Sequence, residues 1–203
     1  MKKSIVFLLL CFSFFAQAQI GIKAGLNFAN VSKASSINSG SRSGFHAGIL
    51  FAPASKKIIG SRTELLFSRQ GYDYKTSTNT GKVSLDYIML PQSMSINITK
   101  FVSLLVGAQM AFLVNAKADT TTSNGSTNSY EEIMDFYNRF DYGFGVGAEI
   151  HPFKGLLVGA KYNISLGKLY KDAQSGQMPS FASIDAKNNL VQIFAGWKFG
   201  KNK

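Results

Sequence analysis

Residues 139–150 read RFDYGFGVGAEI, and this stretch decides the fold. Apolar side chains stand at its even-numbered positions, and charged residues or glycine stand at its odd-numbered positions. Successive side chains of a β-strand point to opposite faces, so the pattern predicts a strand with one apolar face and one polar face. The 12 alternating residues are about twice the length of an ordinary globular strand.

The same two-residue period recurs through the rest of the chain. In the segment 82–98, Val83, Leu85, Tyr87 and Met89 form the apolar face, and beyond Pro91 the apolar positions become even-numbered. Proline cannot donate to the ladder, and an extra residue turns later side chains over, so a β-bulge is expected at Pro91. Together the pattern predicts seven further strands, at 20–29, 44–52, 58–71, 82–98, 101–115, 156–166 and 188–199.

The connections between these strands alternate in length. They are short at 53–57, 97–100 and 151–155, and long and polar at 30–43, 73–81, 116–138 and 168–187. An even number of strands with short turns at one end and long loops at the other is the arrangement of bacterial outer-membrane barrels. Both termini are then periplasmic, and the segment 130–137 in the third loop is expected to form one or two helical turns.

The first 18 residues have the features of a signal peptide. Lys2 and Lys3 precede a short apolar stretch, and Ala16-Gln17-Ala18 supplies small residues for cleavage after Ala18. The alternative, a lipid attached to Cys11, requires a small residue before the cysteine, and Leu10 is not small. Cleavage removes two of the 22 basic residues and the single cysteine, and leaves 11 acidic residues and a net charge of +9. The predicted domains are therefore a signal peptide, 1–18, and a barrel, 19–203.

Glycine and charge share one face of the predicted strands. An eight-stranded barrel is only wide enough to be filled by side chains, so this face suits a packed lumen and the apolar face suits lipid. Isolated buried charges are costly, and a structural network is therefore expected, with a proton or ion path as the alternative. Its candidate members are Lys23, Arg62, Glu64, Asp86, Asp141, Glu149, Lys161 and Lys198.

The strands resemble, in order, the PorT-like family of outer-membrane β-barrel proteins of Bacteroidetes-type bacteria. The resemblance implies an eight-stranded antiparallel up-and-down transmembrane β-barrel, and a role in protein secretion is attached to the family's namesake. One difference is that residues 200–203 follow Phe199, whereas such barrels often end on an aromatic residue. The matching segments are GIKAGLNFA at 21–29, GFHAGILF at 44–51, TELLFSRQG at 63–71, LDYIMLPQS at 85–93, LLVGAQMAFLV at 104–114, DYGFGVGAEI at 141–150, AKYNISLG at 160–167 and NNLVQIFAGWKF at 188–199.

Catalytic and metal chemistry find little support in the sequence. His46 and His151 are the two histidines, expected near opposite ends of the barrel, and they make neither a metal site nor a triad. His46 is expected to be a hydrogen-bonded lumen residue, with a general base of an acyl hydrolase as the alternative. The glycines of GFGVG lie in a strand with no following helix to bind phosphate. No catalytic residue, cofactor or metal is predicted, and the scattered basic residues do not indicate nucleic acid.

The leading functional hypothesis is a non-enzymatic outer-membrane protein of a Gram-negative bacterium that binds a partner through its extracellular loops. Its expected partners are outer-membrane lipid and envelope or secretion proteins. The alternatives are a narrow, porin-like solute channel, a secretion accessory and a soluble lipocalin-like carrier. Loop aromatics are candidates for the contact surface; they are Tyr72, Tyr74, Tyr130, Tyr137 and Tyr170, with Phe136 beside them.

Overall fold

The computed structural model describes residues 18–32, 38–53, 58–75, 79–122, 127–130, 133–171 and 186–199. The predicted signal peptide lies outside the described residues except for Ala18, and so does the tail at 200–203. Within the described ranges, no helix is both long enough and apolar enough to cross a membrane.

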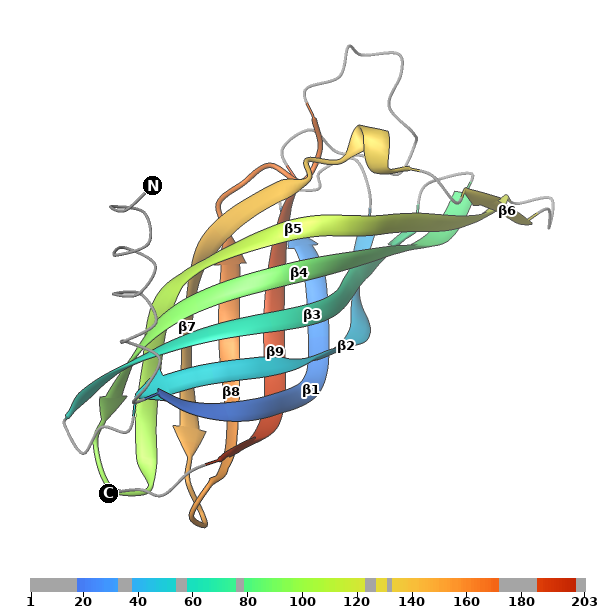
Figure 1. The fold of residues 1–203 in the computed structure, drawn as a ribbon. Helices are drawn as coiled ribbons and strands as arrows, with labels where there is room; N and C mark the ends of the chain where they lie inside the picture. The colour runs from blue at the N-terminus through green and yellow to red at the C-terminus, as the bar shows by residue number, and fades with distance from the viewer. Residues whose placement is uncertain are drawn as a thin grey trace, which may run out of the picture.

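The described chain consists almost entirely of antiparallel strands (Figure 1). A short 3-10 helix, η1 (Met134–Phe136), is the part of the expected helical segment that forms, whereas Tyr130 belongs to a strand. The strands are β1 (Ala18–Ser32), β2 (Asn38–Pro53), β3 (Ile59–Lys75), β4 (Asn79–Asn97), β5 (Val102–Thr122), β6 (Thr127–Tyr130), β7 (Phe140–Ile150), β8 (Leu156–Ser165) and β9 (Lys187–Lys198).

Eight of these strands close into a ring. The sheet runs in the order β4-β3-β2-β1-β9-β8-β7-β5-β6, and a further pairing between β4 and β5 closes it. The ninth strand, β6, pairs with the outer part of β5, from Ala118↔Tyr130 to Thr121↔Thr127. The prediction of an all-β, eight-stranded antiparallel barrel is therefore confirmed, with β6 as an addition that the sequence pattern did not reveal.

Three neighbouring strands are much longer than a membrane crossing requires. β3, β4 and β5 contain 17, 19 and 21 residues, whereas a tilted strand crosses lipid in about 9–11. Their excess lies at the end opposite the short turns, which is the extracellular end in bacterial barrels. We call the resulting sheet the extracellular extension; it comprises residues 38–41, 72–75, 79–83, 116–122 and 127–130.

The two faces of the barrel wall differ as alternation predicts. In β1, Ile22 is 53% exposed while Lys23 beside it is 2% exposed. On all eight barrel strands most outward side chains are apolar, whereas the inward positions carry the buried charges and amides together with apolar side chains such as Leu50 and Phe194. Because an outward apolar belt and an inward polar network suit lipid rather than water, the faces fit a membrane barrel.

The prediction for β4 is wrong on two points. Val83, Leu85, Tyr87 and Met89 are buried inside the barrel, not on the outer face. There is also no bulge at Pro91, because Pro91 pairs in register with Gln109. Proline removes one ladder donor without adding a residue, so the parity of β4 does not change.

The extra residue lies in the neighbouring strand. Asp86 pairs with Asn115 and Tyr87 pairs with Leu113, so Val114 of β5 is the bulged residue. Val114 is 48% exposed, and beyond it the inward positions of β5 change from odd to even numbers. This bulge lets the extension of β5 keep Ala116 and Ala118 inside.

Candidate functional site

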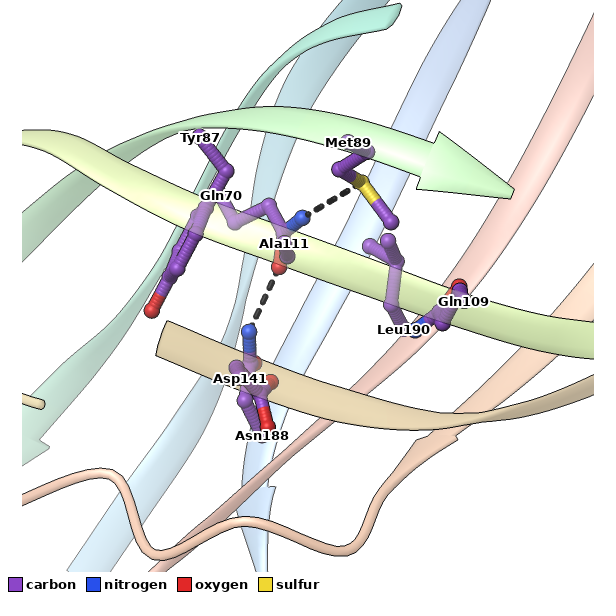
Figure 2. Close-up of a pocket in the computed structure, with 8 residues that line it drawn as sticks. All are labelled: Gln70, Tyr87, Met89, Gln109, Ala111, Asp141, Asn188 and Leu190. Carbon is purple, nitrogen blue, oxygen red and sulfur yellow. Dashed lines mark hydrogen bonds between the residues drawn. The ribbon is translucent and has the colours of Figure 1, made fainter. Parts of the chain in front are cut away.

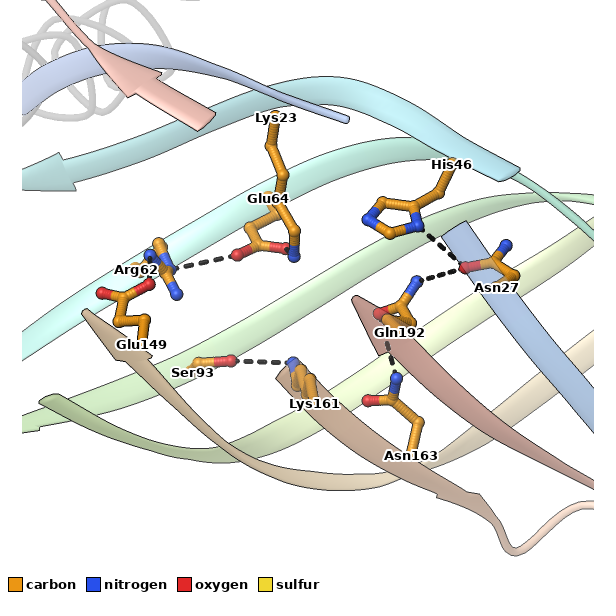
Figure 3. Close-up of polar contacts among 10 residues, drawn as sticks. All are labelled: Lys23, Asn27, His46, Arg62, Glu64, Ser93, Glu149, Lys161, Asn163 and Gln192. Atoms are coloured by element: carbon orange, nitrogen blue, oxygen red, sulfur yellow. Dashed lines mark hydrogen bonds and ion pairs between the residues drawn. The ribbon is translucent and has the colours of Figure 1, made fainter. Parts of the chain in front are cut away.

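An ion network lies inside the barrel (Figure 3). Lys23 Nζ lies 2.8 Å from Glu64 Oε2. Arg62 contacts Glu64 through Nε at 3.0 Å and Glu149 through Nη1 at 2.7 Å. Since Glu149 comes from β7 and Arg62 from β3, the network joins strands that are three places apart in the ring. All four side chains are almost fully buried, as such a network requires.

Lys161 adds a third cation to this interior. Its Nζ donates to Ser93 Oγ at 3.1 Å, and the side chain is 2% exposed. Gly145 makes room for it, because a Cβ at Gly145 would lie 2.7 Å from Lys161 Cε and closer still to Asn163. Glycine on the inward face therefore accommodates charge, and the buried set of three cations and two carboxylates carries an excess of one positive charge.

Amide side chains continue the polar interior toward the extracellular end. Asn27 donates to Ser68 Oγ and to the carbonyl oxygens of Phe45 and Arg69, each at 2.9 Å. Gln192 donates to Asn27 Oδ1 at 3.2 Å and accepts from Asn163 at 3.0 Å. Side chains of β1, β3, β8 and β9 and a backbone carbonyl of β2 thus form one hydrogen-bonded layer.

The remaining predicted members lie outside this network. Asp86 points to the outer surface, where it forms two hydrogen bonds with Arg69 at 2.7 and 3.0 Å. The misassigned parity of β4 explains this error. Asp141 lies near the extracellular end and accepts from Ser165 and from the Tyr142 amide. Lys198 is half-buried at the other end of the barrel, where its amide donates to the Gly155 carbonyl.

The tyrosines expected on the loop surface are instead buried at the extracellular mouth. Tyr72, Tyr137 and Tyr170 are at most 1% exposed, and Tyr74 is 3% exposed. The hydroxyl of Tyr72 hydrogen-bonds to that of Tyr170 and, at 3.0 Å, to that of Tyr137. We call these three residues the tyrosine cluster. Phe136 is half-buried against it, and the side chain of Tyr130 lies outside the described part.

Two short segments hold the tyrosine cluster over the barrel. Tyr137 and Tyr170 form an isolated β-bridge, and Asn138 donates to the carbonyls of Lys168 and Tyr170 at 2.8 and 3.0 Å. We call 133–139 and 166–171 the mouth segments. Burial raises the pKa of Tyr137 and raises that of Tyr170 to about 12, so both phenols stay protonated at physiological pH.

The interior beneath the tyrosine cluster is closely packed. One small cavity between the cluster and the polar layer has room for about one water molecule (Figure 2). Asn188 donates to Gln70 Oε1 at 2.5 Å across it, and Gln70 also contacts Met89 Sδ at 3.3 Å. At the periplasmic end, a second apolar cluster fills the lumen with Leu50, Ala52, Leu105, Leu157 and Phe194. The described interior is a stack of packed layers.

A family model described as the outer membrane protein beta-barrel domain matches residues 15–171, well over half of the chain. The chain belongs to this family. It is therefore a small outer-membrane β-barrel protein of a Gram-negative bacterium. Among curated proteins, none matches it.

Solved structures of outer-membrane barrels share the fold. Ail, the attachment invasion locus protein of Yersinia pestis, is 19% identical with a TM-score of 0.52, over 90% of this chain and 99% of Ail. The structure of Ail in complex with the heparin analogue sucrose octasulfate is 18% identical with a TM-score of 0.51, and the match covers 90% of this chain and 99% of Ail. Neisserial surface protein A is 17% identical with a TM-score of 0.50, and the match covers 89% of this chain and 97% of that protein. At these identities the likeness shows the fold alone.

The histidines of this outer-membrane barrel do not form a catalytic arrangement with the described residues. His46 lies mid-strand, not near the outer end, and its Nδ1 donates to Asn27 Oδ1 at 2.8 Å. His151 Nε2 is 3.2 Å from Glu149 Oε1 and 3.3 Å from Ser103 Oγ. A triad needs the acid and the nucleophile on different ring nitrogens, so this trio, which sequence reasoning missed, has the wrong geometry.

The described part of the extracellular mouth of the barrel is basic. Arg139, Lys168 and Lys171 are exposed on the mouth segments, and the one exposed acid there is Asp135. The outward-facing side of the extracellular extension adds exposed Lys75, Lys82 and Lys117 and the exposed acid Asp119. Exposed charges of one sign attract ligands of the other sign over about a Debye length. The basic mouth is the best candidate functional surface in the described chain.

Proposed function

We propose that this protein is a closed, non-enzymatic outer-membrane barrel that binds an anionic partner at its basic extracellular mouth. The observation that carries the proposal is the placement of Arg139, Lys168 and Lys171 on two segments that are themselves held rigid by the tyrosine cluster. A binding surface on fixed backbone loses little conformational entropy when its ligand arrives.

The packed lumen supports a closed barrel over a solute channel. The ion network, the amide layer and two apolar clusters occupy the described interior, and the small cavity among them has room for about one water molecule. We therefore expect purified protein in planar bilayers to be electrically silent. Steady single-channel conductance would contradict a closed barrel without bearing on the mouth as a binding surface.

Sulfated or phosphorylated saccharide is the partner chemistry that best fits exposed lysine and arginine at a membrane surface, because these side chains pair with multivalent oxyanions. The complex of Ail with a heparin analogue shows that a barrel of this fold binds a sulfated sugar. For the present chain, the support comes from its own cations.

Binding of sucrose octasulfate to the full protein in nanodiscs tests this proposal. Replacing Arg139, Lys168 and Lys171 by Glu should weaken binding at least tenfold at low salt, and added salt should weaken wild-type binding. The matched control replaces Lys100 and Lys154, which are exposed at the periplasmic end, and should bind like the wild type. Equal binding by both variants, or none by the wild type, would refute the proposal.

Export and lineage are further parts of the proposal. The features of residues 1–18 support export with cleavage after Ala18. The eight quoted segments support membership of the PorT-like group, which is narrower than the matched family. A secretion role would follow only from that group, and the lineage prediction rests on the same segments.

A further inference from the structure

One polar pair interrupts the lipid-facing belt. Thr63 of β3 and Gln92 of β4 are register partners, and both are exposed on the outer face. The hydroxyl of Thr63 donates to Gln92 Oε1. Apolar side chains surround the pair, since Leu65 is 40% exposed and Met94 is 43% exposed.

The pair lies midway across the belt. On β3, Thr63 is five residues above exposed Ile58 and six below Arg69. On β4, Gln92 is six residues from exposed Ile98 and six from Asp86. Because the Arg69–Asp86 ion pair marks the polar boundary at one end, the pair lies near the bilayer midplane and not at an interface. Between these limits on β3, β4 and β5, the other outward polar side chain is Ser61.

The amide of Gln92 is only partly satisfied. Its oxygen accepts from Thr63, while its nitrogen donates to none of the described residues. Hydrocarbon offers no hydrogen-bond partner, so an amide N–H facing acyl chains is costly. Elsewhere on these strands the belt has apolar residues at equivalent positions, such as Ala108 directly beside Gln92. The position therefore calls for a protein partner within the membrane.

We propose that the outer face around Thr63 and Gln92 is the contact surface of a homodimer. Two copies inserted in the same direction can form a closed pair only about an axis normal to the membrane. Such an axis places equivalent residues at the same depth, so residues beside the axis meet their own equivalents. Two glutamine amides can then hydrogen-bond reciprocally, because each has both a donor and an acceptor. The small side chains of Ser61 and Ala108 allow the two walls to approach.

Cross-linking in native outer membranes tests the surface. The predicted mature chain has no cysteine, so Ser61→Cys gives a single thiol beside the pair, and Ala160→Cys gives one on the exposed face of β8. Ser61→Cys should form a disulfide-linked dimer, whereas Ala160→Cys should remain monomeric. Equal cross-linking of both would overturn the proposal, and so would cross-linking of Ser61→Cys only to a different protein.

Energy transfer between labelled copies in lipid vesicles gives an independent readout. Gln92→Leu should raise the apparent dissociation constant, in protein-to-lipid units, at least tenfold, and Thr63→Val should raise it less. Met94→Leu, a neighbouring change that keeps the amide, should leave it unchanged. Since Gln92→Leu makes the lipid-facing surface more apolar, the barrel should fold. Wild-type protein that stays monomeric at all protein-to-lipid ratios, or a Gln92→Leu variant that dimerises as well as the wild type, would refute the dimer.

Discussion

Replacing Glu64 by Gln removes the anion that Lys23 depends on. Lys23 Nζ contacts Glu64 at 2.8 Å and also lies 4.0 Å from the centroid of the Phe194 ring. Arg62 loses its 3.0 Å contact with the Glu64 carboxylate but keeps its 2.7 Å contact with Glu149, so Lys23 is the cation left without a carboxylate partner. Removing one partner of a buried ion pair costs about 3–5 kcal/mol. The retained cation–π contact is worth about 0.5–2 kcal/mol and was present beforehand, so it offsets none of this loss.

Urea unfolding of the barrel in lipid vesicles measures this loss. The double variant Lys23→Met, Glu64→Gln should regain most of the lost free energy of unfolding, because replacing both members of a buried pair is often neutral and methionine packs well against an aromatic ring. The resulting coupling free energy should be about 2–3 kcal/mol. The control Asp135→Asn changes an exposed acid outside the barrel. If Glu64→Gln destabilises the barrel no more than this control, the ion network does not stabilise the lumen.

Three further predictions follow from the wall and the mouth. Gly48→Ala should reduce the yield of folded barrel in a heat-modifiability gel, because the added Cβ would lie 2.0 Å from the Leu65 carbonyl oxygen. The control Gly40→Ala, whose Cβ would have its nearest atom at 3.6 Å, should fold like the wild type. Equal yields of the two variants would contradict the close strand contact. Tyr170→Phe should cost about 1 kcal/mol and should make the mouth segments easier to cleave by added protease without changing the folded yield; an unchanged cleavage rate would argue against the cluster. Burial raises the pKa of Tyr170 to about 12 from an ordinary 10.0, so the stabilising effect of this residue is complete below pH 10 and is lost as the pH rises toward 12. Spectrophotometric titration should therefore show tyrosines that ionise only between these pH values. Titration of all tyrosines near pH 10 would count against burial.

Alternation predicted most of the wall because one face of most strands is polar. It failed at β4, where Leu85, Tyr87 and Met89 point inward while Ile88 and Leu90 point outward. Both faces are apolar there, since the inner face packs under the tyrosine cluster. A period of two cannot assign faces when neither is polar, and the error carried Asp86 to the wrong side.

The candidate sites were predictable in kind but not in pairing. Buried charges such as Arg62 and Glu149 were recognisable from the sequence, yet their contact depends on how far each strand is staggered around the ring. The tyrosines were assigned to loops because polar residues surround them. In the structure, long strands and two mouth segments enclose Tyr72 and Tyr170, and a local pattern does not contain such long-range contacts.

The length of β5 has a mechanical consequence. Its 21 residues exceed the membrane crossing by about ten, which at about 3.3 Å per residue is about 33 Å of strand beyond the lipid. Beyond the bulge at Val114, the hydrogen-bond ladder from β4 to β5 continues without a gap to Asn79↔Thr122. The extracellular extension is therefore a rigid continuation of the barrel wall and not a flexible linker. A partner bound to it would keep a fixed orientation relative to the barrel, and a tilt of the barrel in the bilayer would rotate that partner by the same angle.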